Sequence, residues 1–163
     1  MRRTHLLCLL AVSVCLSGVA GSQTPSSPSL SATQRAHLKD ERFQVVTSVR
    51  GLPLGVREAL QALFGTGSLD IAEPGAEFQA TDVVVNAKLP RRRLVAAGCS
   101  SDHCVVHYER GGIARTRYVT LFHWTPAETR FEWGGTAPRS LATIAEMRNA
   151  ILSGEVKSPA STW

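Results

Sequence analysis

Two cysteines, an aspartate and a histidine lie within the six residues from Cys99 to Cys104. An apolar run precedes these residues and another follows, so we expect a loop between two strands, clamped by a Cys99–Cys104 disulfide. A histidine beside an aspartate on a fixed loop can exchange hydrogen bonds and charge with a partner near neutral pH. The candidate partner-binding residues are therefore His103, Asp102, Ser101 and Ser100.

The disulfide also has a purely structural interpretation. It can staple a loop in a small exported domain, and closing so short a ring stabilises the fold by only roughly 2 kcal/mol. A thiol-redox role is disfavoured, because the cysteines of such sites lie closer together at the start of a helix. The sequence leaves the structural and the binding interpretations open.

A metal site is another possibility. If Gly111 and Gly112 form a two-residue turn, the strands on either side pair as a hairpin that places His123 opposite Ser100. Histidine and carboxylate side chains are ligands that zinc accepts, but their spacing here matches no metal motif. The leading interpretation therefore includes no metal and no cofactor, and the alternative ligand set is His103, His123 and Asp102.

Sequence motifs of common enzymes are absent. The chain contains no Gly-x-Ser-x-Gly, no His-Glu-x-x-His and no phosphate-binding glycine loop. The serines beside His103 cannot form a catalytic triad with it, because neighbours in one tight loop do not aim at each other. We expect a protein that is not an enzyme.

The first 20 residues have the pattern of a signal peptide, with two arginines, an apolar run over 6–19 and Gly-Val-Ala at 18–20. Its removal leaves Cys99 and Cys104 as a single pair and lowers the net charge from +5 to +3 (16 basic against 13 acidic residues). So small a charge gives no argument for nucleic acid, and no second apolar run is long enough for a membrane helix. We expect a periplasmic or secreted protein with a flexible leader over 21–31, a single domain over 32–155 and a loose tail over 156–163.

The remaining patterns predict an α+β fold, in which helices cover one face of an antiparallel sheet of about five strands. His107 should decorate a strand face, and the three arginines at 91–93 should form the solvated start of a strand. We expect helices over 33–41, 56–64 and 138–152, and strands over 43–49, 82–87, 94–98, 105–110, 115–124 and 130–133.

The stretch from about 94 to 152 resembles a known family. A Cys-x4-Cys loop between strands, then Phe131-x-Trp133-Gly134, Pro138 and a last helix resemble the periplasmic inhibitors of vertebrate lysozyme (the Ivy family). The resemblance implies a homodimer whose clamped loop enters the active-site cleft of a lysozyme. There the loop histidine of the family hydrogen-bonds the two catalytic carboxylates.

One difference from the family concerns the loop itself. The family loop reads Cys-Lys-Pro-His-Asp-Cys, whereas Asp102 and His103 stand in the opposite order here. We expect a lysozyme-inhibitor-like protein that blocks a peptidoglycan-cleaving enzyme, either a lysozyme or another muramidase, with His103 as the first contact and Asp102 as the second. The alternative is a cell-envelope interaction module of the same fold that inhibits nothing.

Overall fold

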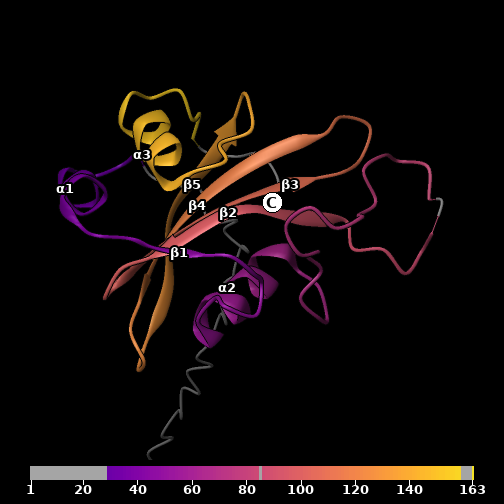
Figure 1. Cartoon of the computed structure of the whole chain (residues 1–163), viewed down its shortest axis with the longest axis horizontal. Coiled ribbons are helices and arrows are strands. Elements are labelled where there is room, and N and C mark those ends of the chain that lie inside the picture. Colours follow the sequence, from indigo (N-terminus) through magenta and orange to yellow (C-terminus); the bar gives the residue numbers. More distant parts are fainter. Residues whose placement is uncertain (1–28, 85, 159–162) are drawn as a thin grey trace, which may run out of the picture.

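The computed structural model describes residues 29–84, 86–158 and 163, so the predicted signal peptide and most of the leader lie outside it. Within these residues, five strands form one sheet in chain order with every neighbouring pair antiparallel, which confirms the predicted α+β class. No helix of this part is long and apolar enough to span a bilayer. The elements are α1 (Ala32–Asp40), β1 (Gln44–Val46), α2 (Leu54–Phe64), β2 (Arg92–Cys99), β3 (His103–Arg110), β4 (Thr116–Trp124), β5 (Thr129–Ala137) and α3 (Ile144–Leu152) (Figure 1).

Helices cover both faces of the sheet, not one as predicted. Neighbouring residues of β3 enter different cores: Val106 packs in the same cluster as Leu60 of α2. Val105 packs with Leu38 of α1 and Met147 of α3, on the opposite face (Figure 1). β3 is buried along nearly its whole length, as is typical of a strand enclosed on both sides.

The last helix begins later than predicted. Thr136 and Ala137, expected near its start, pair with β4 as the end of β5. α3 instead starts after Thr143, whose side chain accepts from the backbone N–H of Glu146 while Glu146 caps Thr143 in return. This reciprocal capping box fixes the helix start more strongly than a proline alone.

The predicted strand over 82–87 is wrong. Its described residues form bends and turns, with Val83 and Val84 exposed. β1 pairs only with the last three residues of β2. Near the start of β2, on its outer edge, Ala72 exchanges backbone hydrogen bonds with Arg92 and Leu94 at 2.8 and 3.0 Å. The Val83 carbonyl instead accepts from the side chains of Gln79 and Thr81, so this run forms its hydrogen bonds locally and not with the sheet.

The arginines at 91–93 are not a uniformly solvated strand start. Arg92 is buried, lies over the Phe64 ring at 4.0 Å and bonds Asp70 at 2.9 Å. Arg93 pairs with the buried carboxylate of Glu109. Two of the three therefore stabilise the fold, and burial lowers the pKa of Arg92.

The described part of the tail is packed, not loose. Val156 is buried, and Lys157 exchanges backbone hydrogen bonds with Thr136 at 2.8 and 2.9 Å. The Trp163 ring packs against the rings of Tyr118 and Phe131. These contacts extend the sheet core toward the end of β5.

Candidate functional site

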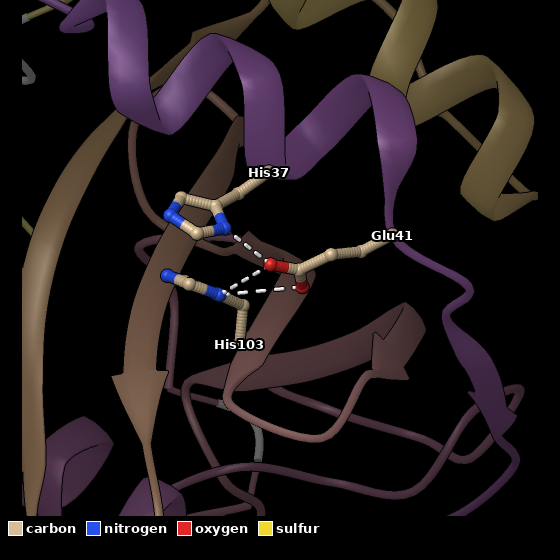
Figure 2. A group of neighbouring side chains, drawn as sticks. All are labelled: His37, Glu41 and His103. Atoms are coloured by element: carbon tan, nitrogen blue, oxygen red, sulfur yellow. Dashed lines mark hydrogen bonds and ion pairs between the residues drawn. The ribbon is translucent and has the colours of Figure 1, made fainter.

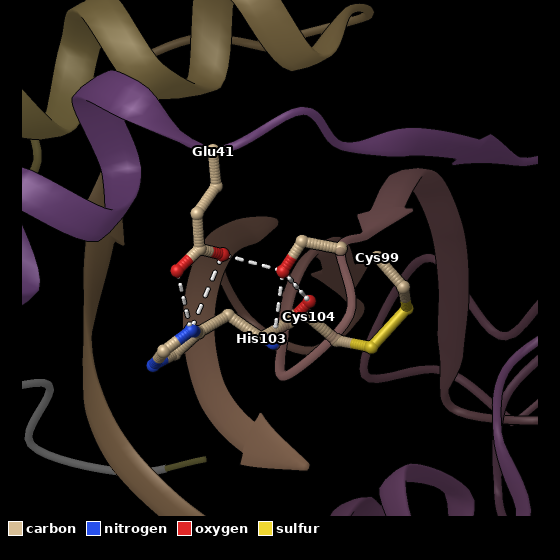
Figure 3. Close-up of a disulfide and its surroundings, with 5 residues drawn as sticks. Glu41, Cys99, His103 and Cys104 are labelled. Atoms are coloured by element: carbon tan, nitrogen blue, oxygen red, sulfur yellow. Dashed lines mark hydrogen bonds and ion pairs between the residues drawn. A yellow bond between two sulfur atoms is a disulfide. The ribbon is translucent and has the colours of Figure 1, made fainter. Parts of the chain in front are cut away.

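The Cys99–Cys104 disulfide closes the β2–β3 connection, as predicted. The two cysteines are directly opposite each other in the strand pair (Figure 3). The backbone N–H of Ser100 donates to the carbonyl of His103 at 2.7 Å, so the connection is a tight turn with little freedom. We call residues 99–104 the clamped turn.

The clamped turn exposes fewer of its predicted binding residues than expected. The Ser101 side chain faces solvent, and 40% of the Asp102 side chain is exposed. His103, the predicted first contact, is the first residue of β3 and only 3% exposed. Since strand side chains alternate between faces, His103 points under α1 and away from the tip of the turn.

A carboxylate from the end of α1 organises the space beneath the turn. The two oxygens of Glu41 lie 3.0 and 3.2 Å from His103 Nδ1, and His37 Nδ1 bonds the same carboxylate (Figure 2). The Ser100 hydroxyl donates to Glu41 as well. Glu41 therefore joins the helix to the clamped turn.

Sequence reasoning missed His37 of α1 and Glu41, the residue that caps the C-terminus of α1. A signal was available, because His37 and Glu41 stand four positions apart and share one side of the predicted helix. What the spacing did not show was that this side faces the clamped turn. That placement depends on α1 packing against α3 over the sheet, as Figure 1 shows.

His123 lies beside His103, as the metal hypothesis required, but in a different register. The β3–β4 connection runs over 111–115 and is longer than the predicted two-residue turn, so His123 pairs with His103 and not with Ser100. The two ring centroids are 5.4 Å apart. The prediction that these histidines meet is confirmed, and the predicted register is wrong.

β5 adds a second carboxylate, that of Glu132. Leu121 pairs with Trp133 and Phe122 with Phe131, which leaves Glu132 as an extra residue in β5. Glu132 lies two residues beyond Arg130, the partner of His123, so it is on the same face, and its Oε2 lies 3.7 Å from His103 Nε2. Glu132 is mostly buried and was not among the predicted site residues.

The structure changes the predicted metal set of His103, His123 and Asp102. Among the residues that the structure describes, two sets hold potential ligand atoms within 4.8 Å of one another: His37, Glu41 and His103, and His103, His123 and Glu132. Asp102 Oδ1 lies 3.3 Å from His103 Nδ1 but belongs to neither set. The second set borders a cavity of about 260 Å³ between α1, the clamped turn and β5.

Asp102 is suited to remain ionised at the tip of the turn. Slight burial acts to raise the pKa of Asp102. The hydrogen bond from the Ser101 hydroxyl and the nearby His103 ring lower it by more, so the pKa of Asp102 is below its ordinary value. Ser101 Oγ donates to Asp102 Oδ1 at 3.1 Å. The exposed part of the turn therefore presents an ionised carboxylate whose position is restrained by the Ser101 hydroxyl.

Comparison with known proteins identifies no relative whose residues could be aligned with this site. No family model matches the chain, and no curated protein or solved structure matches it significantly. The resemblance to the lysozyme inhibitors rests on the residues named above, and the site is interpreted from its own geometry.

Proposed function

We propose that this protein binds and blocks a peptidoglycan-cleaving enzyme of the lysozyme class through the tip of the clamped turn. The observation that carries the proposal is the exposure of Ser101 and Asp102 on a turn whose base is fixed. The disulfide, the Ser100–His103 backbone bond and a bond from Trp124 N to Asp102 O at 2.8 Å all hold that base. A turn already fixed in shape loses little entropy on binding.

The exposed carboxylate sets the chemistry of the contact. An ionised Asp102 repels the two acidic groups of a glycosidase site and attracts lysine or arginine on the rim of the cleft. Vertebrate lysozymes, the target that the resemblance implies, are strongly basic. In this proposal Asp102 takes the role of direct contact, and His103 supports the turn from below.

The test is turnover of peptidoglycan by a panel of lysozymes and lytic transglycosylases with the full chain added. Inhibition of at least one enzyme is expected. The inhibition should weaken in Asp102→Asn by about tenfold, the effect of about 1.4 kcal/mol for one charge-assisted contact. It should also fall with added salt, because the contact is at the surface.

Asp82→Asn is the matched control. Asp82 is exposed and follows Thr81, which pairs with Gly112 just beyond the far end of β3. The length of β3, at about 3.3 Å per residue, puts Asp82 roughly 25 Å from the clamped turn. This substitution removes the same charge and should leave inhibition unchanged. No inhibition of any enzyme by disulfide-intact protein, or equal loss in both variants, would contradict the proposal.

A further inference from the structure

We propose that His103, His123 and Glu132 form a binding site for one divalent transition-metal ion of the zinc class. Glu41 is not a ligand in this site but orients His103 from behind. The inference does not depend on the proposed inhibition, which uses the exposed tip of the same turn.

The orientation of His103 supports this division of roles. Its Nδ1 lies within hydrogen-bond distance of both oxygens of Glu41, so Nδ1 carries the proton and donates to the carboxylate (Figure 2). The other ring nitrogen, Nε2, is left for a metal ion and lies 3.7 Å from Glu132 Oε2. A metal-bound histidine commonly donates its other N–H to a carboxylate in this manner.

The three ligands come from three neighbouring strands. His103 of β3 and His123 of β4 are a directly opposed pair, and Glu132 of β5 lies two residues beyond Arg130, the partner of His123, on the same face. One atom of each lies within 4.8 Å of the others. Separations of this size contract readily around an ion that holds nitrogen and oxygen at about 2.0–2.2 Å.

The chemistry of the ligands selects the ion. Two imidazoles and one carboxylate suit zinc and other late transition metals, whereas calcium and magnesium prefer oxygen ligands. Three protein ligands leave a coordination position for water or an exogenous group. The cavity beside His123 and Glu132 gives that position room. The guanidinium of Arg130 pairs with the other oxygen of Glu132, Oε1, at 3.0 Å and leaves Oε2 directed at His103.

The neighbouring set of His37, Glu41 and His103 is less suited to a metal. The Glu41 carboxylate already accepts hydrogen bonds from His37, His103 and the Ser100 hydroxyl. An ion there would displace bonds that attach α1 to the clamped turn. The same bonds explain why Glu41 positions His103 without binding metal. Glu132 is less engaged on the oxygen that faces His103, because among the described residues its Oε2 accepts only a long bond from Gln34 Nε2 at 3.4 Å.

The experiment is calorimetric titration of chelator-treated, disulfide-intact full chain with Zn²⁺ alone, repeated with Co²⁺ and followed by absorption. One equivalent of Zn²⁺ should bind, and Co²⁺ should give the visible bands of a low-coordinate site. Mg²⁺ in place of Zn²⁺ should give no heat above dilution. Failure of Zn²⁺ to saturate at one equivalent would overturn the site.

Variants separate the two sets of ligands. His123→Gln and Glu132→Gln should weaken Zn²⁺ binding by more than about 100-fold, and Glu41→Gln by about 10–100-fold, the usual effect of an outer partner. His37→Gln is the control and should change little. Loss of binding in His37→Gln with retention in His123→Gln would overturn the assignment.

Nitrogen NMR of the unmodified chain gives a readout that needs no variant. On adding Zn²⁺, the Nε2 resonance of His103 should shift while Nδ1 stays protonated, and a ring nitrogen of His123 should shift with it. Zinc-dependent shifts confined to other histidines would contradict the site even if a variant failed to fold.

Discussion

His103 and His107 lie on the same face of β3, four residues apart, yet the structure gives them different surroundings. His107 is fully buried. Its Nδ1 donates to the carbonyl of Tyr118 at 2.8 Å, and its Nε2 accepts from the backbone N–H of Leu141 at 3.2 Å. His107 therefore lies on a strand face, as predicted, but that face is buried and both ring nitrogens are bonded to the backbone.

The difference shows how two identical side chains on one strand acquire separate roles. Both ring nitrogens of His107 are bonded to backbone, so this ring fastens the segment before α3 to the sheet and has no atom left for a ligand. His103 is held on one nitrogen by Glu41, and its other nitrogen faces a carboxylate beside a cavity. The first arrangement is suited to stability and the second to binding.

The largest expected effect comes from removing the buried ring. His107→Ala leaves the buried N–H of Leu141 without its acceptor and opens a cavity, which should lower the free energy of unfolding by about 3 kcal/mol. Urea denaturation measures this, and Zn²⁺ binding by the folded fraction should persist. His37→Ala, a half-exposed histidine, is the control and should cost far less. Equal losses of unfolding free energy in the two variants would show that the buried His107 contributes no more to stability than the half-exposed His37.

Breaking the clamp should have the next largest effect. Replacing Cys99 and Cys104 together with alanine should lower the free energy of unfolding by about 2 kcal/mol, the amount expected for a short ring. Hydrogen exchange of the Ser100 amide should become faster, because its bond to His103 lies inside the closed ring. Unchanged exchange would mean that the strand pairing alone holds the turn.

His103→Ala should cost less than either change, about 1 kcal/mol for one net hydrogen bond. Glu41 keeps its bonds to His37 and Ser100, so no carboxylate is left without a partner. Denaturation should therefore show a small loss while zinc titration shows a large one. A loss of stability as great as that of His107→Ala would show that the His103 ring is mainly structural.

The smallest expected effect is a pH dependence of stability to which His107 contributes. Burial is the main cause that lowers the pKa of His107. The unfolded chain therefore takes up a proton near its ordinary pKa of about 6.5 while the folded state resists it. Stability should fall as the pH drops below about 6.5 and continue to fall toward the folded pKa.

Urea midpoints across this range, compared with His107→Asn, measure the contribution of the ring. Asparagine keeps an N–H donor near the position of Nδ1 but does not titrate in this range. The variant should therefore lose less stability on acidification than the unmodified chain. Parallel pH profiles for the two proteins would show that His107 does not cause the loss.

Much of the fold was predictable from local patterns. Alternation and β-branched runs identified β3 and β4, and the two cysteines identified the clamp, because these signals depend only on residues near one another in sequence. The strand over 82–87 failed for a non-local reason: Ala72 occupies the edge of β2 that it needed. A local pattern does not show whether a sheet edge is free.

The sequence by itself determined an antiparallel α+β chain with a disulfide at a turn and a histidine on each neighbouring strand. Only the tertiary structure decided which groups surround His103. Glu41 arrives through the packing of α1, and Glu132 through the register of β5, which pairs Arg130 with His123. Both depend on contacts between distant segments, and a one-residue shift changes which face a side chain occupies.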